Sequence, residues 1–293
     1  MVRNDSTASR IFDVFNVIFL ISFAALTVLP FIYVIGTSFA TQAEIAERPF
    51  LLVPRTLQLD GYRYILSSRT LPRAMWVSIW TTIAGTMVSM ALTLTFAYPL
   101  SKKYLKGRST MLLLITFTLV FSGGMIPTFL TVRNLRLLNT YWSMILPGAI
   151  STWNLIVVKN FFQALPDELE ESARIDGASD ITIFLRIILP LSMAAIATFS
   201  LFYAVGYWSA FRPALFYIPS RPERWPVQLI LRNIVMLAAG RIDDANFDPL
   251  LVMPPTESIR NAVIVFATIP ILLVYPFLQK HFTKGVMIGA IKG

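Results

Sequence analysis

The chain has 293 residues, of which 56% are hydrophobic and only 14% are charged, and its mean hydropathy is +0.65. A soluble domain carries about 25% charged residues, so this composition excludes a soluble globule and intrinsic disorder and indicates a membrane protein. The lack of cysteine and the single histidine exclude disulfides, thiolate or multi-histidine metal sites and cysteine nucleophiles. We attribute the net charge of +9 to basic residues that flank membrane spans rather than to nucleic-acid binding.

Six long runs without charged residues predict six transmembrane helices, because a helix needs about 20 residues to cross about 30 Å of hydrocarbon. The six predicted spans are residues 14–40, 74–101, 109–132, 137–158, 187–211 and 261–279. We interpret the first run as a retained helix rather than a signal peptide, because it is longer than a normal signal core and no A-x-A cleavage site follows it. The sequence therefore predicts an all-α integral membrane protein with one domain over residues 1–293.

Proline or glycine interrupts most of these runs, as at Pro127, Pro147 and Pro190. In lipid such residues kink a helix, and neighbouring helices satisfy the carbonyls that lose a hydrogen bond. Kinked helices can bend around a pathway through the membrane. Simple packing explains the same residues equally well.

An even number of spans places both termini on one side of the membrane. If that side is cytoplasmic, the inner segments hold 12 of the 25 Lys and Arg residues, so the raw count does not decide the orientation. The outer basic residues lie mainly in two long loops, 41–73 and 212–260, which can translocate despite their charge. All seven lysines are inside, and the short loop SKKYLKGRS carries four positive charges. These features favour cytoplasmic termini.

The predicted external loop, residues 212–260, contains the amphipathic stretch VQLILRNIVML, which predicts a short helix, and then the acidic stretch RIDDANFD. A loop of this length usually has a function or a partner. Its candidate contacts for an external partner are Trp225, Asp243, Asp244 and Asp248.

The loop between the fourth and fifth predicted spans reads ALPDELEESARIDGASD and holds seven of the 41 charged residues. It predicts a short helix over about 167–178, with Asp167 as the N-cap and acidic residues in the first turn, where the helix dipole favours them. Gly177 suits a left-handed C-cap, and Ser179 can cap the helix that follows.

The surface of this short helix is expected to be small and polar. Glu170 and Arg174 are four residues apart and can form an ion pair on its surface. Its shallow face is formed by Leu169, Ser172, Ala173 and Asp176. Such a face can lie in a cleft of another protein, but a solvated connector with acidic caps explains the pattern equally well.

This loop and the residues after it resemble the EAA motif of ATP-binding-cassette (ABC) importer permeases. The motif is Glu-Ala-Ala, a glycine four positions after the second alanine, and then I-x-L-P. The matching residues here are Glu171, Ser172, Ala173, Gly177, Ile187, Leu189 and Pro190. Ser172 replaces the first alanine and is still small. The segments FSGGMIPTFLTVRNLRLL, NTYWSMILPGAIS and KGVMIGAIKG are similar to permeases of the maltose type, particularly those for larger oligosaccharides or polysaccharide fragments, such as fragments of alginate.

The resemblance implies a type I ABC importer permease fold in a bacterial inner membrane, with six lipid-embedded helices and a cytoplasmic coupling helix. It implies a second homologous permease in a heterodimer, two ATPase subunits that bind ATP and Mg, and an extracytoplasmic sugar-binding protein. Glu171 would pair with a basic residue of an ATPase groove. Ala173 and Gly177 would allow close approach, and Asp176 would help hold the contact. The terminal segment, residues 285–293, would reach toward the ATPases.

The energy for transport is expected to come from other chains. This chain contains no G-x-x-x-x-G-K-[ST] motif and no His- or Cys-based catalytic set, so it is expected to be non-catalytic and to bind no cofactor or metal itself. A secondary transporter driven by an ion gradient is the alternative, but ionisable residues are nearly absent from the spans. The absence of catalytic groups disfavours a membrane-embedded enzyme, and a structural scaffold leaves the EAA motif unexplained.

The sugar pathway is predicted to use aromatic stacking and neutral polar groups in the fourth and fifth spans. The candidate residues are Trp153, Asn154, Tyr203, Tyr207 and Trp208. An interfacial aromatic belt or ordinary packing explains the same residues.

Overall fold

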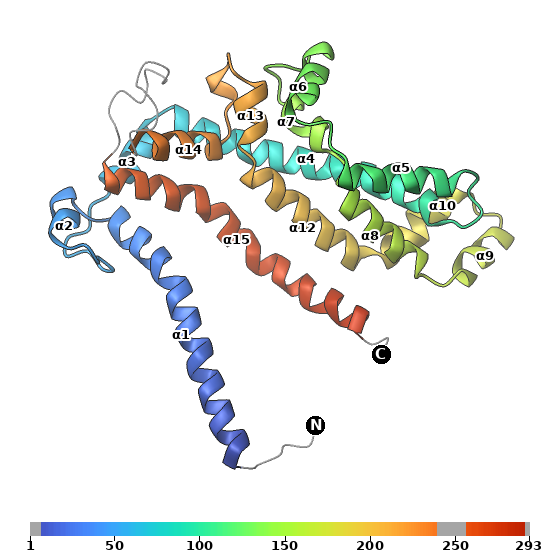
Figure 1. Ribbon diagram of the computed structural model, residues 1–293, viewed down its shortest axis with the longest axis horizontal. Coiled ribbons are helices and arrows are strands. Elements are labelled where there is room, and N and C mark those ends of the chain that lie inside the picture. Colours follow the sequence, from blue (N-terminus) through green and yellow to red (C-terminus); the bar gives the residue numbers. More distant parts are fainter. Residues whose placement is uncertain (1–6, 239–255, 291–293) are drawn as a thin grey trace. The chain divides into compact units, whose positions relative to one another are not determined.

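The computed structural model describes residues 7–238 and 256–290 of the chain (Figure 1). Within these ranges the secondary structure is helical and no strand is present, which confirms the predicted all-α class. Contacts divide the chain into two units, one of residues 1–69 and 233–268 and one of residues 70–232 and 269–293.

The first unit contains three complete helices and parts of two others. They are α1 (Thr7–Ser38), α2 (Gln42–Glu47), α3 (Asp60–Ser67), the end of α14 (Val227–Ala238) and the start of α15 (Glu257–Ala290). Side chains 10–32 of α1 are exposed although most are apolar, as expected for a helix surrounded by lipid. The end of α1 is packed: a Cβ at Gly36 would lie 2.5 Å from the Leu52 carbonyl oxygen, and the Asn261 amide donates to Thr37 Oγ1 at 2.7 Å.

The second unit is built around α4 (Thr70–Ser101), which packs against α8 (Thr152–Gln163) and α12 (Met193–Ser209), as Figure 1 shows. Its other helices are α5 (Arg108–Val120), α6 (Met125–Asn134), α7 (Trp142–Ile145), η1 (Leu146–Gly148), α9 (Glu168–Ile175), α10 (Asp180–Ile183), η2 (Phe184–Ile188), α11 (Leu189–Leu191), α13 (Arg212–Tyr217) and η3 (Pro222–Arg224). It also includes the start of α14 and the end of α15. Its apolar core contains Leu155, Phe162 and Phe199.

Among the described residues, three helical segments are long and apolar enough to cross a membrane: 9–38, 70–101 and 257–274. The other three predicted spans are pairs of helices bent by 118° (α5 and α6), 56° (α7 with η1, and α8) and 81° (α10 to α11, and α12). These three runs are therefore not continuous helices, and the kinks expected from residues such as Pro127, Pro147 and Pro190 are sharp bends within them. The total is six only if each bent pair crosses once, so six spans in one permease domain remain a prediction.

Each bend has a local cause. At the first, Gly124 adopts φ +82°, which strongly favours glycine, directly before α6. At the second, the α-helix tightens into the 3₁₀ turn η1, which contains Pro147. At the third, a π-helical turn precedes Pro190, and Ser192 leaves the helical conformation with φ −99° and ψ 10°.

The amphipathic helix predicted in the external loop is α14, whose residues Leu229, Ile230 and Ile234 are buried. The acidic residues Asp243, Asp244 and Asp248 lie outside the described residues. So do positions 291–293 of the terminal segment, whose residues 285–290 belong to α15.

Candidate functional site

The short helix α9 carries the matched EAA residues, and its C-terminal end is built as the sequence predicts. Asp167 is at the N-cap position, although its side chain makes no capping hydrogen bond. At the other end the Ala178 N–H donates to the Ala173 carbonyl at 2.9 Å, and the Gly177 N–H donates to the Arg174 carbonyl at 3.0 Å. This pair of bonds, with Gly177 at φ +82°, is a Schellman motif.

The next turn is capped as expected. The Thr182 N–H donates to Ser179 Oγ at 3.3 Å and so starts α10. Ser179 therefore fixes the chain direction immediately after α9, and the helix has a defined exit.

A buried ion pair attaches α9 to the end of α4. Glu170 bonds to Lys102, and only 10% and 11% of the two side chains are exposed. The ion pair that the spacing allows between Glu170 and Arg174 is therefore not formed. A surface pair along a helix is worth only about 0.2–0.5 kcal/mol, so a buried partner from another segment readily replaces it.

Arg174 forms a second link between α9 and its surroundings. Its guanidinium donates to the Tyr104 hydroxyl at 2.6 Å and to Asp180 Oδ1 at 2.8 Å, and it lies 5.3 Å from the centre of the Tyr104 ring. The hydrogen bond to Tyr104 is the largest cause of a raised pKa for Arg174, which stays charged. We call the contacts of Lys102 with Glu170 and of Arg174 with Tyr104 and Asp180 the α9 attachment.

A cavity of about 560 Å³ lies beside the bend between η1 and α8. Its lining is Thr128, Ser143, Met144, Pro147, Gly148, Ser151, Asn154, Phe202, Tyr203, Gly206, Tyr207, Ala210, Pro213 and Tyr217. These side chains offer hydroxyls, an amide and aromatic rings, and none is charged. The cavity can hold a sugar ring through hydrogen bonds and stacking.

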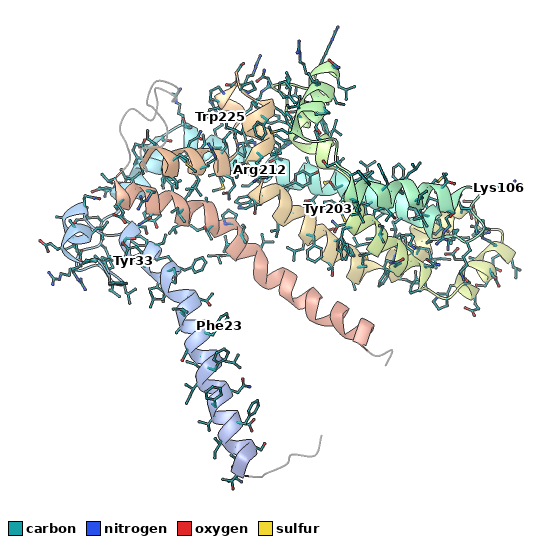
Figure 2. The ribbon with its side chains drawn as sticks, viewed as in Figure 1. Phe23, Tyr33, Lys106, Tyr203, Arg212 and Trp225 are labelled. Carbon is teal, nitrogen blue, oxygen red and sulfur yellow. The ribbon has the colours of Figure 1, made fainter. Side chains whose placement is uncertain are left out.

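Three of the five predicted pathway residues line this cavity together: Asn154, Tyr203 and Tyr207. Figure 2 labels Tyr203 on α12. The other two do not line it. Trp153 is 64% exposed, and Trp208 is buried beside a separate apolar cavity of about 220 Å³ formed with α4 and α15.

No protein-family model matches the chain. Protein LplC of Bacillus subtilis (strain 168) is 53% identical over 291 residues, which cover 99% of this chain and 98% of that protein. The polygalacturonan/rhamnogalacturonan transport system permease protein YtcP of the same strain is 50% identical over 285 residues, which cover 97% of this chain and 99% of YtcP. The chain belongs to the family of carbohydrate ABC importer permeases.

A solved structure gives the same answer for the fold of this permease. A chain of a bacterial ABC transporter that imports the acidic polysaccharide alginate matches it with a TM-score of 0.86 and 30% identity, over 96% of this permease and 100% of that chain. The predicted ABC importer permease fold is therefore confirmed.

The EAA residues of the permease divide into an exposed and a buried set. Glu171, Ser172, Asp176 and Gly177 are exposed, whereas Ala173 is 8% exposed and packs into the permease's own core near Phe162. Ala173 thus joins α9 to this chain instead of lying on its outer face. Close approach to an ATPase at this position would need α9 to move.

The I-x-L-P part of the motif lies at the bend before α12. Ile187 belongs to the π-helical turn η2, and Leu189 and Pro190 belong to the three-residue helix α11. Ile187 and Leu189 are half-buried, whereas Pro190 is exposed. π-Turns are frequent at functional sites, and here the turn precedes the change of direction within the fifth predicted span.

Two residues differ from the partner contacts predicted from the sequence. Ile175 is 87% exposed and stands four residues after Glu171, so α9 presents an apolar side chain beside a carboxylate. The sequence could have indicated this exposed contact, because Ile175 is an isoleucine within a charged eight-residue helix. Trp225, by contrast, donates its indole N–H to the Ile218 carbonyl at 2.8 Å and packs against the cluster with Val77, so it has a structural role.

Proposed function

We propose that this permease forms, with a second and different permease, the translocation pathway for fragments of uronic-acid polysaccharides. The proposal rests mainly on one observation: YtcP is 50% identical over nearly its whole length and is named for polygalacturonan and rhamnogalacturonan. The structural relative is a transporter of alginate, which is also an acidic polysaccharide. Both names point to substrates whose repeating units carry carboxylates.

The cavity beside η1 suits such a substrate. Its lining is neutral, so the carboxylates of a fragment meet no like charge from the residues that form it. Asn154 and Ser151 offer polar groups, and Phe202 and Tyr217 offer ring faces. Release into the cytoplasm requires weak contacts, and neutral hydrogen bonds satisfy that requirement better than fixed ion pairs.

The outer face of α9 is the contact that we assign to an ATPase subunit. Glu171 and Ile175 are both exposed and lie one turn apart, so the face combines a carboxylate with an apolar side chain. A groove with a basic residue beside an apolar floor would accept it. ATP and Mg are bound and used on the two ATPase chains, and this chain is a non-catalytic subunit.

The direction of transport follows from the orientation. We place α9, the SKKYLKGRS loop and both termini in the cytoplasm of a bacterial cell, and residues 41–73 and 212–260 outside the inner membrane. An extracytoplasmic binding protein then delivers the sugar to the side opposite the ATPases.

The decisive experiment is to purify the permease with candidate ATPase, second-permease and binding-protein subunits from the same organism, and to reconstitute the complex in vesicles. Oligogalacturonate bound to the binding protein is expected to stimulate ATP hydrolysis, with maltotriose as the neutral control. Stimulation by neutral sugars alone would overturn the substrate class. Transport by this chain alone under an ion gradient would overturn the ABC mechanism.

A further inference from the structure

The bend in the fourth predicted span leaves two backbone groups without their helical partners. The Ala149 N–H donates to the Leu146 carbonyl at 3.2 Å, which is the bond of a 3₁₀ turn. In a continued α-helix it would have donated to Ile145, whose carbonyl is thereby freed. The Ser151 N–H likewise has no helical partner, because α8 begins only at Thr152. We call residues 145–151 the span-four break.

Two tyrosines of α12 bond to these groups. The Tyr207 hydroxyl donates to the Ile145 carbonyl at 3.2 Å, and the Tyr203 hydroxyl accepts the Ser151 N–H at 3.1 Å. The tyrosines are four residues apart, so they lie on one face of α12, one turn from each other. Each bond gives a backbone group that lost its helical partner at the break a new partner within the protein.

The same two hydroxyls also bind α4. Ser89 Oγ lies 2.8 Å from the Tyr207 hydroxyl, and Thr93 Oγ1 lies 2.7 Å from the Tyr203 hydroxyl. Ser89 and Thr93 are fully buried and are themselves four residues apart. Because the Tyr207 hydroxyl uses its proton on a carbonyl, Ser89 must be its donor.

The ring of Tyr207 packs closely against α4 at Gly85. A Cβ at Gly85, one turn before Ser89, would lie 2.8 Å from three atoms of that ring. Only glycine at this position lets the ring lie against the α4 backbone and bring its hydroxyl to Ser89 and to the span-four break. The span-four break, α4 and α12, which all belong to the second unit, therefore meet at the hydroxyls of Tyr203 and Tyr207.

We propose that Tyr203 and Tyr207 are positioning residues whose hydroxyls fasten the span-four break to α4 and α12. This deepens the function proposed above and rests on it. The two hydroxyls are committed to protein partners, so they hold the wall of the cavity and leave sugar binding to the ring faces and to groups such as Asn154. The break, α4 and α12 then change position as one body during the transport cycle.

The test removes only the hydroxyls and keeps the rings. In the reconstituted complex, Tyr207→Phe and Tyr203→Phe are each expected to lower the maximal ATPase rate evoked by loaded binding protein about fivefold, the effect of one lost hydrogen bond. The concentration of loaded binding protein for half-maximal rate should not change. Tyr98→Phe is the matched control, because this α4 tyrosine is also buried but its hydroxyl has no hydrogen-bond partner in the structure.

A double-mutant cycle separates fastening from general destabilisation. Ser89→Ala combined with Tyr207→Phe should be no worse than Tyr207→Phe alone, because both changes remove the same bond. Equal losses for every sugar that the importer accepts are also expected. A loss confined to one sugar, or fully additive losses, would overturn the proposal in favour of direct sugar contact or independent packing.

A structural readout decides the proposal even if no sugar stimulates the complex. The chain has no cysteine, so Met87→Cys on α4 and Ile150→Cys in the break, both exposed positions, can carry two spin labels. The distance distribution between them is expected to broaden in Tyr203→Phe/Tyr207→Phe and to stay narrow in Tyr98→Phe. An unchanged distribution in the double variant would refute the fastening role. Failure of sugar stimulation in the unmodified complex would instead refute the proposed function alone.

Discussion

The α9 attachment and the span-four break are both held in place by side-chain contacts, but the side chains that make these contacts differ in chemistry. Both tie a short helical segment to α4 or to the loop directly after it, but the first uses the Lys102–Glu170 ion pair and the bond from Arg174 to Tyr104, and the second uses only hydroxyl side chains. The α9 attachment belongs to a loop that we place outside the bilayer, where charges keep part of their hydration. The break lies within a predicted span, where an ion pair would have to be fully desolvated. Location in the membrane thus decides which side chains can connect the elements.

The two sets of contacts also differ in the effect expected when one partner is removed. Removal of one charge from a buried pair leaves the other charge without compensation, whereas removal of a hydroxyl leaves at most one neutral group unsatisfied. Variants of the α9 attachment should therefore have larger effects than variants at the break. The predictions below test this order.

The largest effect is expected for Lys102→Ala. It leaves the carboxylate of Glu170 buried and unpaired, which destabilises the contact of α9 with α4 by about 3–5 kcal/mol. The yield of complex with the ATPase after purification should fall sharply. Lys103→Ala is the control, because the neighbouring lysine is exposed. A normal yield with Lys102→Ala would show that this ion pair does not hold α9.

Gly85→Ala tests the other region by overpacking. The added methyl group would meet the Tyr207 ring at 2.8 Å, which costs about 1–3 kcal/mol if the ring is held in place. The thermal unfolding midpoint of the purified permease should fall, and adding Tyr207→Leu should restore part of the loss. Gly123→Ala is the control, because its nearest neighbour would be the Pro127 Cβ at 3.9 Å. An equal midpoint for both alanine variants would indicate that the ring moves freely.

Gly177→Val tests the left-handed backbone conformation at the end of α9. A Cβ at Gly177 meets no atom within 4 Å, so the cost comes only from a β-branched residue at φ +82°, about 1–2 kcal/mol. Transport should be impaired by Val but retained by Gly177→Asn, because asparagine tolerates the left-handed conformation. Equal impairment by both residues would place the defect in contact with a partner instead.

Composition and run length were sufficient to predict an all-α membrane protein, and local signals predicted the Schellman end of α9 and the cap at Ser179. Proline and glycine predicted kinks in these spans, but the size of the bends was not predictable, because hydropathy measures apolar length and is insensitive to a single residue such as Gly124 at positive φ. The Glu170 partner was also missed, since periodicity considers only residues on the same helix. Thr93 and Tyr203 are 110 positions apart, so their bond depends on how α4 and α12 pack.

The smallest effect on the permease itself is expected at Glu171, which completes the comparison because its carboxylate is charged but not buried. Glu171→Ala should change the unfolding midpoint very little, since exposed surface substitutions usually stay within about 0.5 kcal/mol. Its loss should appear only with the partner, as weaker binding of the ATPase and ATP hydrolysis that no longer responds to loaded binding protein. Glu168→Ala, also exposed and in the first turn of α9, is the matched control for the lost charge. If both variants bind the ATPase as the unmodified permease does, the outer face of α9 is not the coupling surface. If both weaken binding equally, long-range charge rather than a specific contact at Glu171 governs the docking of α9.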